Sequence, residues 1–427
     1  MEQTYIKDLK SNLDKEVTLK GWVYNFRSSG KIGFLQLRDG SGFAQCIVSQ
    51  TSVDEQTWKV MEEMTIESSV EISGTVSKHP KLDEYEVQVK TLKFFQRAEE
   101  YLIGKKEHGP DFLLENRHLW LRAPKQWAIQ RVRNTVINAI YEFLNNDGFI
   151  KIDSPILTPA ACEGTTELFE MKYFDEGKAY LSQSGQLYIE AAIASFGKVF
   201  DFGPVFRAEK SKTKRHLTEF WMMDAEMAFA DHAKNLEVQE NLIAHVAKKV
   251  LELNQKELDI LERDKTALEK ITAPFNRLTY KDAIKMLQEL GSDIKDGEDL
   301  GNDDETLIMS KFDKPLFIEK WPANIKAFYM KREGDLALCA DMIAPEGHGE
   351  VIGGSQREDD HEVMHQRIVD DKLPEEAFTW YLELRKFGSV PHSGFGVGLE
   401  RLVGWMCGVQ HVRETIPFPR MINRIYP

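Results

Sequence analysis

Residues 206–220 read FRAEKSKTKRHLTEF and gather Arg, Lys and His side chains into one short segment. The chain as a whole is acidic, with a formal net charge of -14, so this positive segment stands out. Apolar residues flank it at 199–205 and at 220–223, and these flanks predict two buried strands joined as a β-hairpin. A solvated loop is the ordinary explanation of a short charge run. The apolar flanks argue against that explanation, because the loop would open from a buried core. A polyanionic substrate is the alternative, since Arg and Lys match phosphate oxygens in charge.

The composition indicates a globular protein of two or three domains. The chain has 427 residues, of which 42% are hydrophobic. No apolar run is long enough to cross a membrane, and the first residues lack the apolar core of a signal peptide. The cysteines at positions 46, 162, 339 and 407 are far apart, which argues against a disulfide framework or a zinc site. We therefore expect a cytoplasmic protein with no membrane attachment.

The N-terminal part alternates in the manner of short strands. The candidates are residues 17–23, 32–37, 43–48, 69–76 and 85–95, and residues 54–67 read as one helix between the third and fourth of them. Turn residues such as Asp39-Gly40-Ser41-Gly42 separate the strands. This pattern predicts a small Greek-key barrel of the oligonucleotide-binding (OB) type, with another small β-domain as the alternative.

The C-terminal part begins after a polar connection at 104–124. Apolar residues recur at helical spacing from Trp127 to Leu144, and a short strand at 149–152 is stopped by Pro155. The acidic stretch 293–305 reads as a surface loop. Residues 394–401, GFGVGLER, form a glycine run that would let the backbone approach a ligand, followed by an apolar helix at 399–407.

Three of these segments, in this order, resemble the three motifs of the class II aminoacyl-tRNA synthetases. Motif one is the helix at Trp127 with GFIKIDSP at 148–155, motif two is FRAE at 206–209, and motif three is GFGVGLER. The barrel resembles the anticodon-binding domain of the aspartyl, asparaginyl and lysyl subgroup. The resemblance implies a multidomain α+β protein. An OB-fold anticodon-binding domain would span 1–103, a linker 104–124, and a catalytic domain on an antiparallel sheet flanked by helices 125–427.

The resemblance assigns ATP-binding roles by position. Arg207 would hold the α-phosphate and Arg401 the γ-phosphate, and we expect these two cations to be catalytic. Phe220 would stack on adenine. The remaining expected ATP contacts are Glu209, His216, Glu350 and Gly398.

The resemblance implies Mg²⁺ as the cofactor, bound with ATP by Asp341 and Glu350, which match the acidic pair of the family. Hard carboxylate oxygens suit that ion. The aspartyl relatives have a serine ligand three residues after the glutamate, whereas this chain has Gly353.

Three segments bear on the amino acid. The resemblance implies that Glu163 is the partner of the substrate ammonium group and Arg357 the partner of its side-chain end. In Ser182-Gln183-Ser184-Gly185-Gln186-Leu187-Tyr188-Ile189, Ser182 and Gln186 are expected contacts. The aspartyl enzymes have a proline at the position of Gly185, and at the position of Ile189 a lysine that binds the aspartate carboxylate.

The loss of that lysine favours asparagine as the substrate. An asparagine amide needs one donor and one acceptor. Arg357 can donate, and Asp224, with Glu226 as the alternative, can accept. We therefore expect activation of L-asparagine and its transfer to tRNA(Asn), with an aspartyl-tRNA synthetase, possibly nondiscriminating, as the alternative function.

The resemblance implies that Arg27, Phe34 and Gln45 lie on the RNA-facing side of the barrel, where Phe34 would stack on an anticodon base. Motif one builds a symmetric interface in the family, so a homodimer is expected.

Two other functions fit this sequence less well. An asparagine-forming ligase of this family would lack the barrel, and a pure RNA-binding protein would not need the ATP residues.

Overall fold

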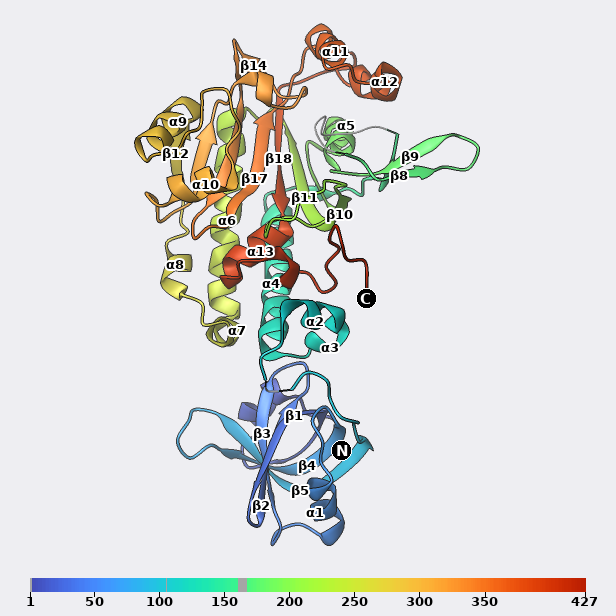
Figure 1. Ribbon diagram of the computed structural model, residues 1–427, viewed down its shortest axis with the longest axis vertical. Coiled ribbons are helices and arrows are strands. Elements are labelled where there is room, and N and C mark those ends of the chain that lie inside the picture. The colour runs from blue at the N-terminus through green and yellow to red at the C-terminus, as the bar shows by residue number, and fades with distance from the viewer. Residues whose placement is uncertain (1, 105, 160–166) are drawn as a thin grey trace. The chain divides into compact units, whose positions relative to one another are not determined.

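The computed structural model describes residues 2–104, 106–159 and 167–427. The chain forms two compact units, Met1–Gly109 and Pro110–Pro427 (Figure 1). Residues 110–124, which the sequence predicts to be part of a linker, carry the short helices α2 (Pro110–Glu115) and α3 (Arg117–Trp120). The fully buried guanidinium of Arg117 donates to the carbonyl oxygen of Pro417 at 2.8 Å. Both short helices therefore belong to the second unit.

The first unit is a closed barrel with strand order β1-β2-β3-β5-β4. Apolar side chains alternate into it; in β3, for example, Ala44, Cys46 and Val48 are buried while Gln45 faces outward. Asp54 caps the helix between β3 and β4 by accepting from the Thr57 amide at 2.7 Å. These features confirm the predicted OB-type barrel. Its elements are η1 (Ile6–Asn12), β1 (Glu16–Ser29), β2 (Ile32–Arg38), β3 (Phe43–Ser49), α1 (Glu55–Glu62), β4 (Ser69–Lys78) and β5 (Tyr85–Gln96).

The second unit is built on a sheet with the order β12-β13-β16-β17-β18-β11-β10-β6. The central strands pair antiparallel, as predicted, and a parallel pair closes each end, β12 with β13 and β10 with β6. The sheet is therefore mixed. Its strands are β6 (Ile150–Lys151), β10 (Lys198–Phe206), β11 (Glu219–Ala228), β12 (Asn276–Thr279), β13 (Leu316–Glu319), β16 (Cys339–Ala344), β17 (Gly349–Gln356) and β18 (His392–Gly398).

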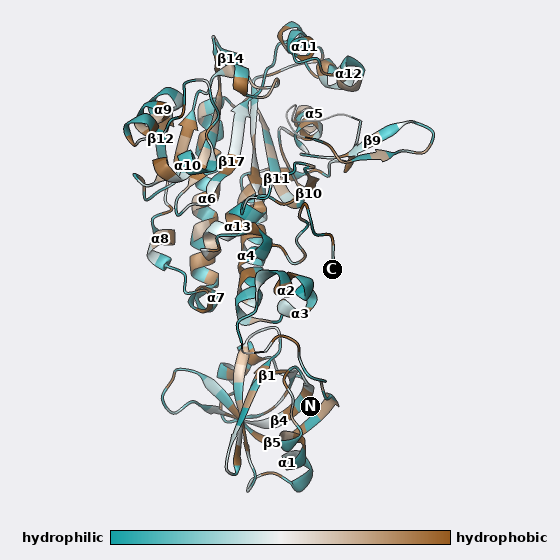
Figure 2. Ribbon diagram, viewed as in Figure 1, coloured by the Kyte–Doolittle hydropathy of each residue, from teal (hydrophilic) through white to brown (hydrophobic). Residues whose placement is uncertain are grey.

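Helices cover this sheet. The amphipathic helix predicted from Trp127 is α4 (Pro124–Asn146), and it packs beside α6 (His232–Leu253) (Figure 1). Val132, Val136 and Ile140 of α4 are fully buried in one core with residues of α6, α13 and the central strands. Figure 2 shows both apolar and polar stretches along α4 and α6, as expected for amphipathic helices at a surface.

The remaining helices and strands complete the second unit. They are β7 (Leu157–Thr158), β8 (Glu170–Lys172), β9 (Lys178–Leu181), β14 (Arg332–Glu333), β15 (Leu336–Ala337), α4 (Pro124–Asn146), α5 (Gln186–Phe196), α6 (His232–Leu253), α7 (Gln255–Ile260), α8 (Lys265–Glu269), α9 (Tyr280–Glu289), α10 (Asn302–Met309), η2 (Ala323–Ile325), α11 (His361–Asp370), α12 (Glu375–Glu383), α13 (Leu399–Cys407) and η3 (Val412–Glu414).

The prediction of a surface loop over 293–305 is wrong at its end, where α10 begins. Asp303, Asp304 and Glu305 form the first turn of that helix, and Asp304 accepts from the Gly301 amide at 3.1 Å. Acidic side chains stabilise a helix N-terminus through its dipole. The negative run therefore starts a helix.

Candidate active site

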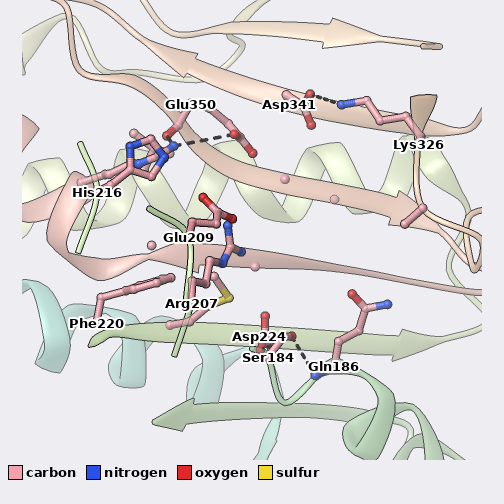
Figure 3. A pocket seen from close by; sticks show the side chains of 18 of the residues that line it. Ser184, Gln186, Arg207, Glu209, His216, Phe220, Asp224, Lys326, Asp341 and Glu350 are labelled. Carbon is pink, nitrogen blue, oxygen red and sulfur yellow. Dashed lines mark hydrogen bonds and ion pairs between the residues drawn. The ribbon is translucent and has the colours of Figure 1, made fainter. Parts of the chain in front are cut away.

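A cavity of about 680 Å³ opens on the sheet beside β11, β16, β17 and β18 (Figure 3). Most of the predicted catalytic, ATP, metal and amino-acid positions line it. They are Gln186, Arg207, Glu209, His216, Phe220, Asp224, Asp341, Glu350, Arg357, Gly398 and Arg401. The fold thus brings together residues that are more than 200 positions apart in the chain, from Gln186 to Arg401, as the motif order predicts.

Two described positions of the predicted amino-acid site do not line this cavity. Glu226 is completely buried beneath the cavity, and Ser182 lines a smaller neighbouring cavity of about 190 Å³. Asp224 lines both cavities. Glu163, the predicted partner of the substrate ammonium group, lies outside the described residues.

Arg207 follows directly after β10 and lies over Phe220 of β11. The guanidinium carbon is 5.5 Å from the Phe220 ring centroid, and the Arg207 amide donates to the Thr218 carbonyl at 3.0 Å. Its Nε is buried and, within the described part of the chain, has no hydrogen-bond partner. A buried donor without a partner is costly, so this nitrogen is suited to a ligand oxygen.

The loop between β10 and β11 has two faces. Lys210, Lys212 and Lys214 are exposed. Ser211 and Thr213 point inward instead and contact His216, with Ser211 Oγ 3.2 Å from His216 Nδ1. Burial and the nearby Arg401 guanidinium lower the pKa of His216, which favours the neutral ring. The alternating lysines give this loop its positive outer surface.

Arg215 differs from the three exposed lysines of this loop. Its side chain is mostly buried, forms an ion pair with Glu305 of α10, and donates to Asn302 at 2.8 Å and to the Gly347 carbonyl at 2.6 Å. Gly349 makes room for this ion pair. A Cβ there would lie 2.3 Å from both Arg215 Nη1 and Glu305 Oε2, and its φ of +72° also favours glycine. Arg215 therefore fastens the loop to α10.

Acidic and basic side chains lie next to one another on the cavity wall that carries Asp341, Glu350 and Arg401. Arg401 donates to the Glu350 carbonyl at 2.7 Å, and its guanidinium lies 3.7 Å from the Glu350 carboxylate. A Cβ on Gly353 would lie 3.1 Å from Glu350 Oε1 and 3.7 Å from Asp341 Oδ1, so both predicted metal ligands meet beside this glycine. Burial raises the pKa of Asp341 to about 6, and the Lys326 ammonium opposes that shift.

Lys326 is a cavity residue that the sequence analysis missed. It donates to Asp341 Oδ2 at 2.6 Å, and its ammonium lies 3.7 Å from the Trp321 ring centroid (Figure 3). The available signal was a single lysine between apolar residues, in Ile325-Lys326-Ala327-Phe328. Such a lysine is rarely buried without an acidic partner.

The other end of the cavity carries Asp224, beside Ser184 and Gln186 (Figure 3). Asp224 Oδ2 accepts from Ser184 Oγ and from the Gly185 amide, both at 2.9 Å. Burial raises the pKa of Asp224 to about 6, and these two donors oppose that shift. Ile189, where the aspartyl enzymes have a lysine, is fully buried in a cluster with Ile193 and Val199.

Arg357 and Glu226 form a completely buried ion pair next to this end. Arg357 Nε donates to Glu226 Oε1 at 2.8 Å, and Arg357 Nη1 donates to Ser355 Oγ at 2.6 Å. Burial raises the pKa of Glu226, while Arg357 lowers it. Glu226 and Ser355 thus hold the Arg357 guanidinium in place at the cavity.

A further network lies behind this ion pair. Glu190 of α5 is buried and accepts from Tyr381 Oη at 2.8 Å, from Arg385 at 2.8 Å and from Gln186 Nε2 at 3.1 Å. Although burial alone would raise its pKa, Arg385 and His392 hold the pKa of Glu190 well below the usual range. The network anchors Gln186 at the amino-acid end.

The glycines of β18 make room for side chains of the neighbouring strand β11. Gly394 pairs with Glu226 and Gly396 with Asp224. A Cβ would lie 2.1 Å from Glu226 Oε1 at Gly394 and 2.7 Å from Asp224 Oδ1 at Gly396, whereas nothing lies within 4 Å at Gly398. Gly394 and Gly396 were predicted to approach a ligand. In the structure they approach the carboxylates of Glu226 and Asp224 instead.

The predicted anticodon residues lie on the barrel in the first unit. Arg27 and Phe34 are cross-strand neighbours in β1 and β2, with the guanidinium carbon 4.7 Å from the ring centroid. Gln45 pairs with Gln36, and its Nε2 donates to Glu86 at 3.1 Å. Phe34 and Gln45 share the outward-facing side of adjacent strands.

Comparison with protein families matches residues 109–422 to the class II tRNA synthetases of the D, K and N type, and residues 17–94 to the OB-fold nucleic acid binding domain. The chain belongs to the class II tRNA synthetases. Within the described residues of this synthetase, no helix is long and apolar enough to cross a membrane.

Solved structures place the synthetase near asparaginyl enzymes. The asparaginyl-tRNA synthetase of Pyrococcus horikoshii, complexed with asparaginyl-adenylate, is 42% identical over 100% of both chains, with a TM-score of 0.96. The asparaginyl-tRNA synthetase of Entamoeba histolytica, also with asparaginyl-adenylate, is 31% identical over 97% of both chains, with a TM-score of 0.88. The aspartyl enzyme of the same organism is 28% identical over 100% of this chain and 93% of that chain, with a TM-score of 0.84.

Proposed function

We propose that this synthetase activates L-asparagine with ATP and transfers it to tRNA(Asn), giving Asn-tRNA(Asn), AMP and diphosphate. The observation that carries the choice of asparagine is the buried carboxylate of Asp224 at the amino-acid end of the cavity, with Ile189 packed in the core where the aspartyl enzymes have a lysine. The similarity to asparaginyl enzymes over the whole chain supports it.

The ATP end of the cavity is proposed to work mainly by positioning and charge neutralisation. Arg207 binds the α-phosphate, Phe220 stacks on adenine, and Arg401 binds the γ-phosphate. The asparagine carboxylate attacks the α-phosphorus, and diphosphate leaves as the adenylate forms. Preorganised cations favour this step because they neutralise charge as it develops. Glu209, His216 and Gly398 complete the nucleotide site in this proposal.

Asp341 and Glu350 are proposed to hold Mg²⁺. Their carboxylates meet beside Gly353, and oxygen donors of this kind fit a hard divalent cation. When bound, the ion would neutralise negative charge on the ATP phosphates. Lys326 occupies one oxygen of Asp341, which leaves the other oxygen for a ligand.

Recognition of asparagine is proposed to use both ends of its side-chain amide. Arg357 donates to the amide oxygen, and Asp224 accepts from the amide nitrogen. Ser182 and Gln186 form the adjoining wall, Glu226 holds Arg357 from below, and Glu163 contacts the substrate ammonium group. A buried site of this kind rejects a ligand that leaves its polar groups unpaired.

The barrel is proposed to bind the anticodon through Arg27, Phe34 and Gln45. The exposed lysines of the β10–β11 loop are proposed to contact the acceptor end of the tRNA, because their positive charge suits phosphate. We further propose a cytoplasmic location, where tRNA charging takes place.

A homodimer is proposed through motif one. Ile150, Ile156 and Leu157 lie in and after this motif and are more than 40% exposed, which suits burial against a second copy. Sedimentation equilibrium is expected to give twice the mass of one chain. Replacement of Ile150 and Ile156 by Lys is expected to shift the mass to that of a monomer, whereas a monomeric unmodified chain would contradict the proposal.

The test of the proposed function is ATP–diphosphate exchange with a panel of amino acids, followed by charging of a tRNA(Asn) transcript. Exchange is expected with asparagine at a far higher kcat/KM than with aspartate or lysine. Equal activation of aspartate and asparagine would favour a nondiscriminating aspartyl enzyme instead.

A further inference from the structure

Asp224 uses its two carboxylate oxygens differently. Oδ2 accepts both hydrogen bonds, from Ser184 Oγ and from the Gly185 amide, each at 2.9 Å. No residue that the structure describes donates a hydrogen bond to Oδ1, which lies 2.7 Å from the point where a Cβ on Gly396 would stand. The side chain is only 5% exposed and lines the cavity. The turn at 184–185 therefore leaves one oxygen of Asp224 for a ligand.

Gly185 is required for space and for its N–H, and not for its backbone angles. Its φ of -80° suits every residue, proline included. A Cβ at this position would stand 2.3 Å from Asp201 Oδ2 and 2.7 Å from Ser154 Oγ. The Gly185 carbonyl accepts from Ser154 Oγ at 3.3 Å, so both the N–H and the C=O of this residue are engaged.

We propose that Gly185 and Ser184 are positioning residues that set the choice of asparagine over aspartate, by binding Oδ2 of Asp224 and presenting Oδ1 alone to the substrate. This inference rests on the proposed function. The single free oxygen accepts one N–H of the asparagine amide and repels a substrate carboxylate. The two donors of the turn are engaged by Asp224, so neither binds aspartate.

The charges around Asp224 agree with this arrangement. Burial and, to a smaller extent, Asp201 on the neighbouring strand β10 disfavour the ionised carboxylate of Asp224, whereas the two donors of the turn and Arg357 favour it. Loss of either donor would therefore allow the Asp224 carboxylate to rotate. It would also increase the fraction of Asp224 that is protonated. A protonated carboxyl group donates a hydrogen bond, which suits an aspartate side chain.

The experiment compares three variants with the unmodified full-length chain in ATP–diphosphate exchange. Gly185→Pro adds a Cβ and removes the N–H, whereas its matched control Gly185→Ala adds the Cβ and keeps the N–H. Ser184→Ala removes the second donor without adding volume. The quantity measured is the ratio of kcat/KM for asparagine to kcat/KM for aspartate, and thermal unfolding establishes that each variant is folded.

The ratio is expected to fall about tenfold or more in Gly185→Pro and in Ser184→Ala, since one hydrogen bond to a charged group is lost in each. In Gly185→Ala the ratio is expected to stay near that of the unmodified chain, even where both kcat/KM values fall. An unchanged ratio in Ser184→Ala, or the same ratio in Gly185→Pro and Gly185→Ala, would overturn the inference. If Gly185→Pro fails to fold, Ser184→Ala decides. Absence of asparagine-dependent exchange in the unmodified chain would instead overturn the proposed function.

Discussion

Arg207 combines the two properties expected of a phosphate ligand, a half-buried guanidinium and an Nε without a hydrogen-bond partner in the described chain. Arg207→Ala is expected to lower kcat/KM for ATP–diphosphate exchange by about 10²–10³-fold, because one preorganised donor is lost where charge develops. Arg207→Lys is expected to recover only part of this, because a lysine cannot replace the planar donor pair.

Arg277→Ala is a matched control for this prediction. Arg277 also lies over a phenylalanine ring, 5.8 Å from the Phe317 centroid, but it stands on the edge strand β12 away from the cavity. Its removal is expected to leave exchange within about twofold of the unmodified enzyme, since surface substitutions rarely matter. Near-normal exchange in Arg207→Ala would show that the α-phosphate is bound elsewhere.

Asp224 predicts a pH dependence of amino-acid selection. Burial raises its pKa to about 6, so the carboxylate prevails above that pH and the protonated form below it. The carboxylate accepts from asparagine and repels aspartate, so the selectivity is expected to fall about tenfold or more between pH 8 and pH 5.5. The ratio of the two kcat/KM values is the measurement, because it cancels titration of shared ATP groups such as His216. A ratio that stays constant over this range would show that Asp224 does not select the amino acid.

At the scale of elements, the loop between β10 and β11 depends on its attachment to α10. Arg215→Ala is expected to raise the KM for ATP about tenfold, because the segment that carries His216 loses its ion pair with Glu305. Gly349→Ala tests the same attachment independently, since its Cβ would enter the space between the two side chains. Kinetics of exchange at varied ATP give the measurement. An unchanged KM in both variants would mean that the loop holds its position without α10.

Individual elements were predictable where a periodic pattern and a local stop signal coincide. The helices α4 and α13 and the strands β10 and β11 follow from such patterns. The glycine run was misread in part, because only the register of β11 against β18 places Asp224 and Glu226 over Gly396 and Gly394. No local pattern contains that register. The partners of Lys326 and Glu190 were missed for the same reason, since they come from distant segments.

At the scale of the whole molecule, the two compact units predict two separable activities. Phe34→Ala on the barrel removes a stacking surface worth ~1–3 kcal/mol per base, so charging of tRNA(Asn) is expected to fall about tenfold or more in kcat/KM. Adenylate formation uses the other unit and is expected to continue at its ordinary rate. Aminoacylation and diphosphate exchange, measured on the same preparation, distinguish the two, and an equal loss of both would indicate damage to folding.

The family was predictable because three motifs occur in order along the chain, and the amino-acid preference because Ile189 stands where the aspartyl enzymes have a lysine. The fit of each side chain inside the cavity was not, since it depends on contacts between motifs. The pairing of Gly396 with Asp224 is one such contact. It bears on any effort to reprogram the enzyme for another amino acid. A larger acid or amide at position 224 has to share space with whatever stands at 396, so a library that randomises 224 alone samples mostly blocked pockets. Joint randomisation of both positions reaches substrates that neither substitution reaches separately.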